Sequence, residues 1–98
     1  MNKKNAIEVL RANHAALRAV GVAHAWLFGS IAKDEANGDS DIDVMIDVAR
    51  EPFSMLDLIG VQQTLEDIFR RRVDVVVRAD ALKGEKLRNA ADQALYVF

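Results

Sequence analysis

Large apolar residues recur at helical spacing in three parts of this chain. Within 3–20 they stand three or four positions apart, with charged residues elsewhere around the helix. A second stripe follows Pro52, where Ser54 can cap a helix that ends at the basic run 70–72. The pattern predicts a last helix over about 81–94. Each of these helices would bury one face.

Between the helices lie segments with the character of strands. Residues 23–28 are apolar and aromatic, and 73–77 are rich in valine, as buried strands are. Over 41–48 apolar and polar positions alternate, so one face is core and the other is acidic. The tail 95–98 is either a short final strand or a packing arm. The order predicts an α/β (α+β) fold, a small mixed β-sheet with helices packed on one face.

Composition narrows the possible functions. A length of 98 residues suits one domain spanning 1–98, and 51% hydrophobic with 29% charged residues is typical of a globular protein. The net charge of −2 argues against direct nucleic-acid binding, because no global positive field is present. The absence of cysteine excludes disulfides and thiolate metal sites and agrees with a cytoplasmic location. The longest uncharged stretch, 19–32, is too short to span a membrane.

Three carboxylates stand on predicted strands: Asp41 and Asp43 on one, and Asp74 on another. Residues i and i+2 of a strand point the same way about 6–7 Å apart, so the first two can share metal ions. Magnesium prefers carboxylate oxygens and leaves its other positions to water and phosphates. An isolated Asp-x-Asp pair, however, more often lies on a solvated strand face.

Gly29-Ser30 ends the strand that precedes these carboxylates. A glycine there lets backbone N–H groups approach a phosphate closely, and a following helical turn offers its positive end. The alternative is an ordinary strand-to-helix turn with Ser30 as N-cap. The two signals together indicate a phosphate site beside a metal site, because they occur on successive strands.

The segment 27–36, followed by Ser40-Asp41-Ile42-Asp43-Val44, resembles the signature of the DNA-polymerase-β-like nucleotidyltransferase superfamily. More narrowly, it resembles that superfamily's minimal nucleotidyltransferases (MNT). The shared pattern is an apolar strand, Gly-Ser, a basic residue, a loop, Ser-Asp-x-Asp in a second strand and an acidic residue in a later one. The resemblance implies the palm-like sheet of that superfamily, with 73–77 as the third-carboxylate strand.

The resemblance also implies a nucleotide site. Ser30 and the amide groups near Gly29 would bind the β- and γ-phosphates of ATP, and Lys33 and Ser40 are assigned to the same site. Lys33 can equally be a solvated helix residue. Many relatives have glycine where this chain has Asp34. A carboxylate at that place would repel the phosphates unless it points away, which would weaken catalysis.

The carboxylates take the metal role under the same resemblance. Asp41 and Asp43 would hold two Mg²⁺ ions, and Asp74 would be the third ligand, near the ion that activates the acceptor hydroxyl. A hydroxyl would attack the α-phosphorus in line and release pyrophosphate.

The family setting implies the partner. Minimal nucleotidyltransferases are commonly antitoxins paired in a hetero-oligomer with a HEPN-domain toxin, and they transfer AMP from ATP onto a tyrosine hydroxyl of that toxin. Larger family members carry further domains for the acceptor, for which these 98 residues leave no room, so the partner would supply much of the acceptor site. One alternative is an antitoxin that neutralises its partner by binding alone. A further alternative is nucleotidyl transfer to a small molecule.

Overall fold

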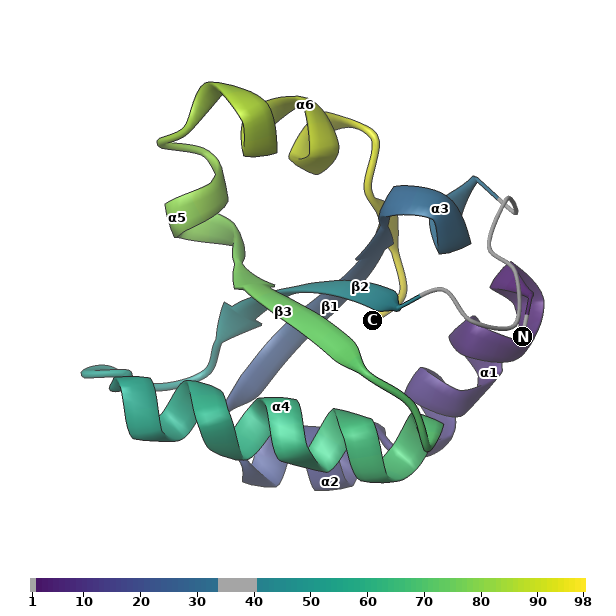
Figure 1. Cartoon of the computed structure of the whole chain (residues 1–98). Coiled ribbons are helices and arrows are strands. Elements are labelled where there is room, and N and C mark those ends of the chain that lie inside the picture. Colours follow the sequence, from purple (N-terminus) through teal and green to yellow (C-terminus); the bar gives the residue numbers. More distant parts are fainter. Residues whose placement is uncertain (1, 34–40) are drawn as a thin grey trace.

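A mixed β-sheet forms the centre of the molecule (Figure 1). The computed structural model describes residues 2–33 and 41–98. Within them the strand order is β3-β2-β1-β4. β2 runs antiparallel to β1 and parallel to β3, and β4 is antiparallel to β1, so the predicted mixed sheet is confirmed. The strands are β1 (Val22–Phe28), β2 (Ile42–Val48), β3 (Val73–Val77) and β4 (Leu95–Tyr96).

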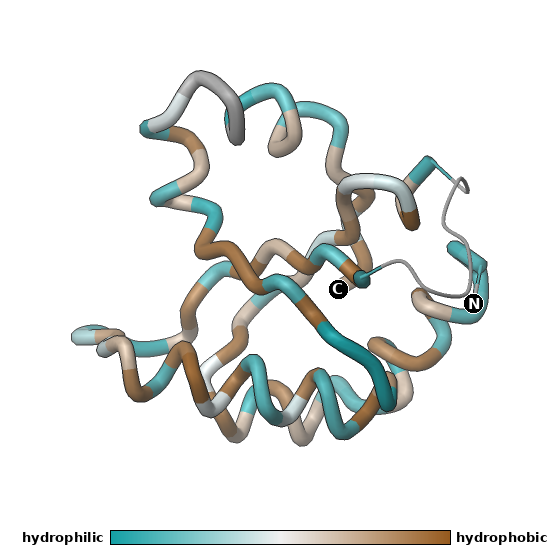
Figure 2. Tube along the Cα trace, in the orientation of Figure 1, coloured by the Kyte–Doolittle hydropathy of each residue, from teal (hydrophilic) through white to brown (hydrophobic). Residues whose placement is uncertain are grey.

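Three helices cover one face of this sheet: α1 (Lys3–Ala12), α2 (His14–Ala19) and α4 (Met55–Phe69). They meet the alternate apolar positions of the strands, and along α4 hydrophobic and hydrophilic residues alternate with the helical repeat (Figure 2). Burial of these side chains is the main source of stability, at roughly 25 cal/mol per Å² of apolar surface. The largest fully buried side chains of this core are Leu10, Leu17, Leu27, Ile31, Ile42, Ile46 and Leu65.

The opposite face carries a second, smaller apolar cluster. Phe28, Met45 and Ala81 are buried there, against α5 (Arg78–Ala81) and α6 (Glu85–Asp92). The expected helices on one face are therefore observed for α1, α2 and α4, while the C-terminal helices pack on the other side. The helix predicted over 81–94 is shorter than expected: α5 ends at Ala81, and α6 begins only at Glu85 because Gly84 is extended and serves as its N-cap.

Local side-chain chemistry sets the other helix ends. The helix predicted over 3–20 is divided at Asn13, whose side-chain amide donates to the Val9 carbonyl at 2.8 Å. Such bonds compete with the helical ladder and favour a break. Ser54 caps α4 as predicted, in a reciprocal capping box with Asp57. At its other end α4 stops at Arg70, which has left-handed backbone angles.

The C-terminal tail forms a short strand, and the residues after it continue to hydrogen-bond to β1. Leu95–Tyr96 forms β4, and Val97 N–H donates to the Ala25 carbonyl at 2.9 Å. The tail is thereby fixed to β1. No helix in the described ranges 2–33 and 41–98 is long and apolar enough to cross a membrane.

Candidate functional site

One lateral row of the sheet brings the predicted carboxylates together. Asp43 on β2 is the register partner of Phe28 on β1 and of Asp74 on β3. Directly paired positions share a face, because side chains alternate along every strand in step. The neighbours Ile42 and Val44 are fully buried in the main core, so Asp43 and Asp74 project from the other face. The register therefore places the carboxylates of two separate strands side by side.

The negative charge of Asp43 is destabilised by its surroundings. Asp43 is half-buried, and burial is the main cause that raises its pKa above the usual range. The charges of Asp74 and then Asp41 raise the pKa further, as does a hydrogen bond with the Asp74 side chain. Because neighbouring carboxylates repel one another, a cation placed here would be stabilised.

Asp41 stands outside the pair. It precedes β2 and is exposed, yet it is close enough for its charge to raise the pKa of Asp43. Across the described residues no group of three or more His, Cys, Asp or Glu side chains is gathered closely enough to hold a metal ion. The structure therefore unites Asp43 with Asp74, and leaves Asp41 at the margin.

The backbone of Gly29 lies in close contact with the side chain of Asp43. Its φ of +70° is in the left-handed region, and a Cβ built on it would collide with Oδ2 of Asp43 and lie 3.1 Å from Cγ. Only glycine has both the backbone freedom and the missing side chain that this contact requires. Gly29 opens the short helix α3 (Gly29–Ala32), so the Gly-Ser turn and the carboxylate are parts of one site.

Ser30 does not cap α3. The N-cap is Phe28, with no side-chain hydrogen bond to the helix, and Ser30 lies within the first turn. The alternative of an ordinary serine N-cap is therefore excluded. Lys33 is exposed at the C-cap of the same helix. Ser40 and Asp34 lie outside the residues that the structure describes, so their assigned roles stay predictions.

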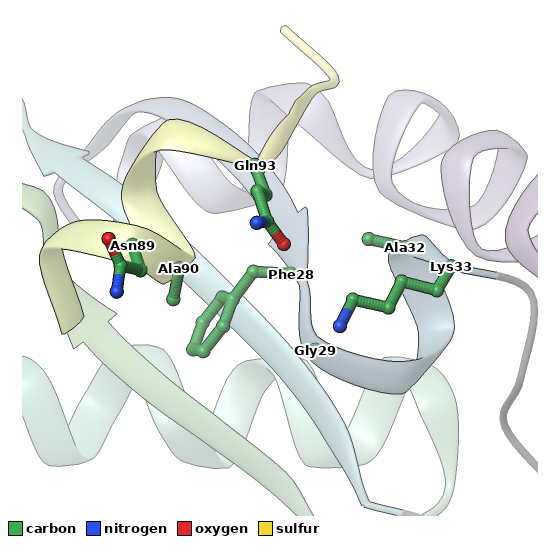
Figure 3. Close-up of a pocket in the computed structure, with 7 residues that line it drawn as sticks. All are labelled: Phe28, Gly29, Ala32, Lys33, Asn89, Ala90 and Gln93. Carbon is green, nitrogen blue, oxygen red and sulfur yellow. The ribbon is translucent and has the colours of Figure 1, made fainter. Parts of the chain in front are cut away.

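A pocket of about 350 Å³ opens between α3 and α6, above the side chain of Phe28 (Figure 3). Gly29, Ala32 and Lys33 line it from the α3 side, and the Lys33 amine extends toward it. Sequence reasoning found Gly29 and Lys33 but missed the α6 wall. That wall depends on how α6 packs across the sheet, for which the sequence carries no local signal. The lining residues from α6 and its end are Asn89, Ala90 and Gln93.

Several other polar residues stay outside the site. Asp47 pairs in register with His24, several residues along β2 from the carboxylate row. His14 stacks against the ring of Phe98, with 4.1 Å between centroids, which makes it a packing residue. The ring of Tyr96 packs against the ring of Trp26 on β1, and the Tyr96 hydroxyl lies 3.2 Å from Nδ1 of His24.

The sequence matches the model of one protein family, described as the nucleotidyltransferase domain, over residues 5–97. It is 33% identical over 90 residues to the protein adenylyltransferase MntA of Thermococcus cleftensis. That similarity covers 91% of this chain and 89% of the relative.

Solved structures share the fold. One described as a minimal nucleotidyltransferase has a TM-score of 0.70 and 27% identity, and the match covers 100% of this chain and 96% of that one. A toxin–antitoxin complex with AMP-PNP gives a TM-score of 0.69 at 22% identity, covering 100% and 73%. A complex of tri-AMPylated Shewanella oneidensis HEPN toxin with MNT antitoxin gives 0.52 at 19%, covering 99% and 69%.

Proposed function

We propose that this chain, which belongs to the nucleotidyltransferase domain family, is a protein adenylyltransferase that transfers AMP from ATP to a hydroxyl group of a partner protein. The named relative, similar over 91% of this chain, is a protein adenylyltransferase. The fold is shared with a complex that contains AMP-PNP, an ATP analogue. Membership of the family implies a nucleotide substrate, and these likenesses support ATP.

We further propose that the partner is a HEPN-type toxin and that the chain acts as its antitoxin. Two complexes with this fold are toxin–antitoxin pairs, and in one of them the HEPN toxin carries AMP groups. A tyrosine of the toxin is the proposed acceptor, and the pair would form a hetero-oligomer in the cytoplasm. The absence of cysteine from the chain agrees with that reducing compartment.

Asp43 and Asp74 are the proposed centre of the metal site, with Asp41 as a further ligand. Their donor set consists of carboxylate oxygens alone, which suits Mg²⁺, and their mutual repulsion supplies a reason to bind a cation. We expect two ions. When bound, Mg²⁺ neutralises phosphate oxygens and polarises the attacking hydroxyl. Asp74 stands on β3, the strand next to β2, and the acceptor is proposed to approach from that side.

The α3 turn is proposed to hold the triphosphate. The first backbone N–H groups of α3 receive no side-chain cap, and they are available to donate hydrogen bonds to phosphate oxygens. Lys33 projects toward the same pocket and would offset phosphate charge (Figure 3). The acceptor hydroxyl oxygen attacks the α-phosphorus and its proton passes to solvent, the bond between the α-phosphorus and the α–β bridging oxygen breaks, and pyrophosphate leaves. The chain's part is to position the reactants and offset their charge.

The observation that carries this proposal is the close contact of Gly29 with Asp43, since it joins the phosphate turn to the carboxylate row. The test mixes the purified chain with ATP, Mg²⁺ and its partner, and mass spectrometry then looks for added AMP residues. Asp43→Asn should abolish transfer without unfolding the protein, and Asp47→Asn is the matched control on the same strand. Absence of any adduct from a folded wild-type chain would contradict the proposal.

A second candidate is neutralisation by binding alone. It is favoured by the finding that, among the described residues, no three carboxylates are gathered into a preformed metal site. The double variant Asp41→Asn with Asp43→Asn separates the two functions in cells that express the toxin. Protection by this variant would support binding alone, whereas loss of protection with an intact complex would require catalysis.

A further inference from the structure

The α6 wall of the pocket carries two side-chain amides. Asn89 lies in α6 and Gln93, four positions later, is the C-cap residue at its end; both line the pocket. Both residues are exposed. Within 2–33 and 41–98 neither side chain makes a hydrogen bond to another described residue. These amides are therefore available to a ligand in the pocket.

The rest of the pocket suits a flat, apolar ring. Phe28 forms its floor, and Ala32 and Ala90 contribute small apolar side chains (Figure 3). Its volume of about 350 Å³ lies at the lower end of the range of small-molecule sites. The positive group is on the opposite wall, where Lys33 extends from α3. The two walls thus separate a region for phosphates from a region for a base.

We propose that this pocket holds the adenine of ATP and that Asn89 and Gln93 recognise the edge that carries its 6-amino group. The inference rests on the proposed function and assigns the residues that select the base of its nucleotide. With the triphosphate at the α3 wall, the base extends toward α6, against Phe28 and Ala90.

The chemistry of the purine edge explains why amides are suited to this role. Adenine has an amino donor at position 6, with the acceptors N1 and N7 on either side. A carboxamide offers one acceptor and one donor next to each other, which match an amino group and its neighbouring ring nitrogen. Guanine has an oxygen at position 6, so an amide arranged for N6 and N7 of adenine faces two acceptors. The pair therefore favours adenine over guanine.

The test measures binding rather than turnover. The full chain with Mg²⁺ is titrated calorimetrically with the α,β-methylene analogues of ATP and GTP, whose α–β bond cannot be cleaved by transfer. The wild-type chain should bind the ATP analogue more tightly. Asn89→Ala and Gln93→Ala should each weaken that binding by roughly 2- to 10-fold, the range of one hydrogen bond. Binding of the GTP analogue should change much less.

Asp92→Ala is the matched control, because Asp92 is exposed on α6 and does not line the pocket. It should bind both analogues as the wild-type chain does. If an alanine variant does not fold, Asn89→Leu and Gln93→Met keep the approximate size of the side chain without adding charge, and they remove the amide, so they should show the same selective loss.

Two results would overturn the inference: a wild-type chain with no preference between the analogues, or variants that lose affinity for both equally. The proposed function fails separately. A chain that prefers the ATP analogue but never modifies a partner would retain the base pocket and lose the transferase role. A chain that transfers nucleotides without base preference would do the reverse.

Discussion

Replacing Gly29 with alanine tests the geometry of the whole site. The residue has a φ of +70°, and an added Cβ would collide with Oδ2 of Asp43. Left-handed backbone angles cost a residue with a side chain about 1–2 kcal/mol. For a domain of this size, 1 kcal/mol lowers the Tm by roughly 4–8 °C, so we expect a decrease of about 4–16 °C. The collision also displaces the Asp43 carboxylate, and transfer activity should therefore be lost.

Two other glycines provide matched controls. Gly21 has a φ of +107°, and a Cβ there would lie 3.1 Å from Cε1 of Phe53, far along β1 from the carboxylates. Gly21→Ala should lower the Tm yet leave the activity of the folded fraction intact. Gly60 lies inside α4, and apart from its chain neighbours and the backbone of that helix nothing lies within 4 Å of an added Cβ. Gly60→Ala should stabilise the protein by roughly 0.5–1 kcal/mol, because alanine loses less entropy in a helix.

The assay combines thermal unfolding followed by circular dichroism with transfer measured well below each Tm. If Gly29→Ala unfolds within about 2 °C of the wild-type chain, smaller than the least decrease calculated above, and keeps its activity, the close approach to Asp43 is wrong. If the Tm of Gly29→Ala falls but its activity per folded molecule persists, the variant behaves like Gly21→Ala. The left-handed backbone of Gly29 would then matter for stability, and the proposed effect on the Asp43 carboxylate would be refuted.

Further predictions concern charge and capping. Because burial and neighbouring carboxylates raise the pKa of Asp43 in the folded state, ionising it opposes folding. Without metal at neutral pH, Asp43→Asn should thus be more stable than the wild-type chain. The difference in unfolding free energy should vanish as the pH falls below the unfolded pKa near 3.8. Urea titrations at several pH values measure this difference. Mg²⁺ should raise the Tm of the wild-type chain but not that of Asp43→Asn, and an equal shift in both would place the ion elsewhere. Ser54→Ala removes the capping box of α4 and should cost about 1 kcal/mol in denaturant unfolding, whereas an unchanged midpoint would show that the cap contributes nothing.

Alternation and composition were enough to predict the three longer strands, and the Gly-Ser turn followed by the Asp-x-Asp strand pointed to Gly29 and Asp43 as members of adjoining sites. Each of these patterns lies within one short segment of the chain, so the sequence shows it directly. The pairing of Asp43 with Asp74 needed more, because the register of two parallel strands depends on the packing of α4 between them in the chain. The position of α6 was not predictable at all. It follows from contacts of small alanines with Phe28 and Met45 across the sheet, and no local pattern encodes such contacts. The division of the first helix likewise depends on a single Asn13 side chain competing with the backbone.

The register of β2 with its neighbouring strands determines both which side chains enter the core and where the Asp43 carboxylate lies. Ile42 and Val44 are buried on one side, and Asp43 faces the other. Adding or deleting one residue inside this strand would move every later side chain of the strand to the opposite face of the sheet. Carboxylates would then point into the main core, and apolar side chains would point away from it. A library of loop-length variants after Val48 should therefore retain function far more often than a library with insertions between Asp43 and Val48, even when the inserted residues are themselves good strand formers.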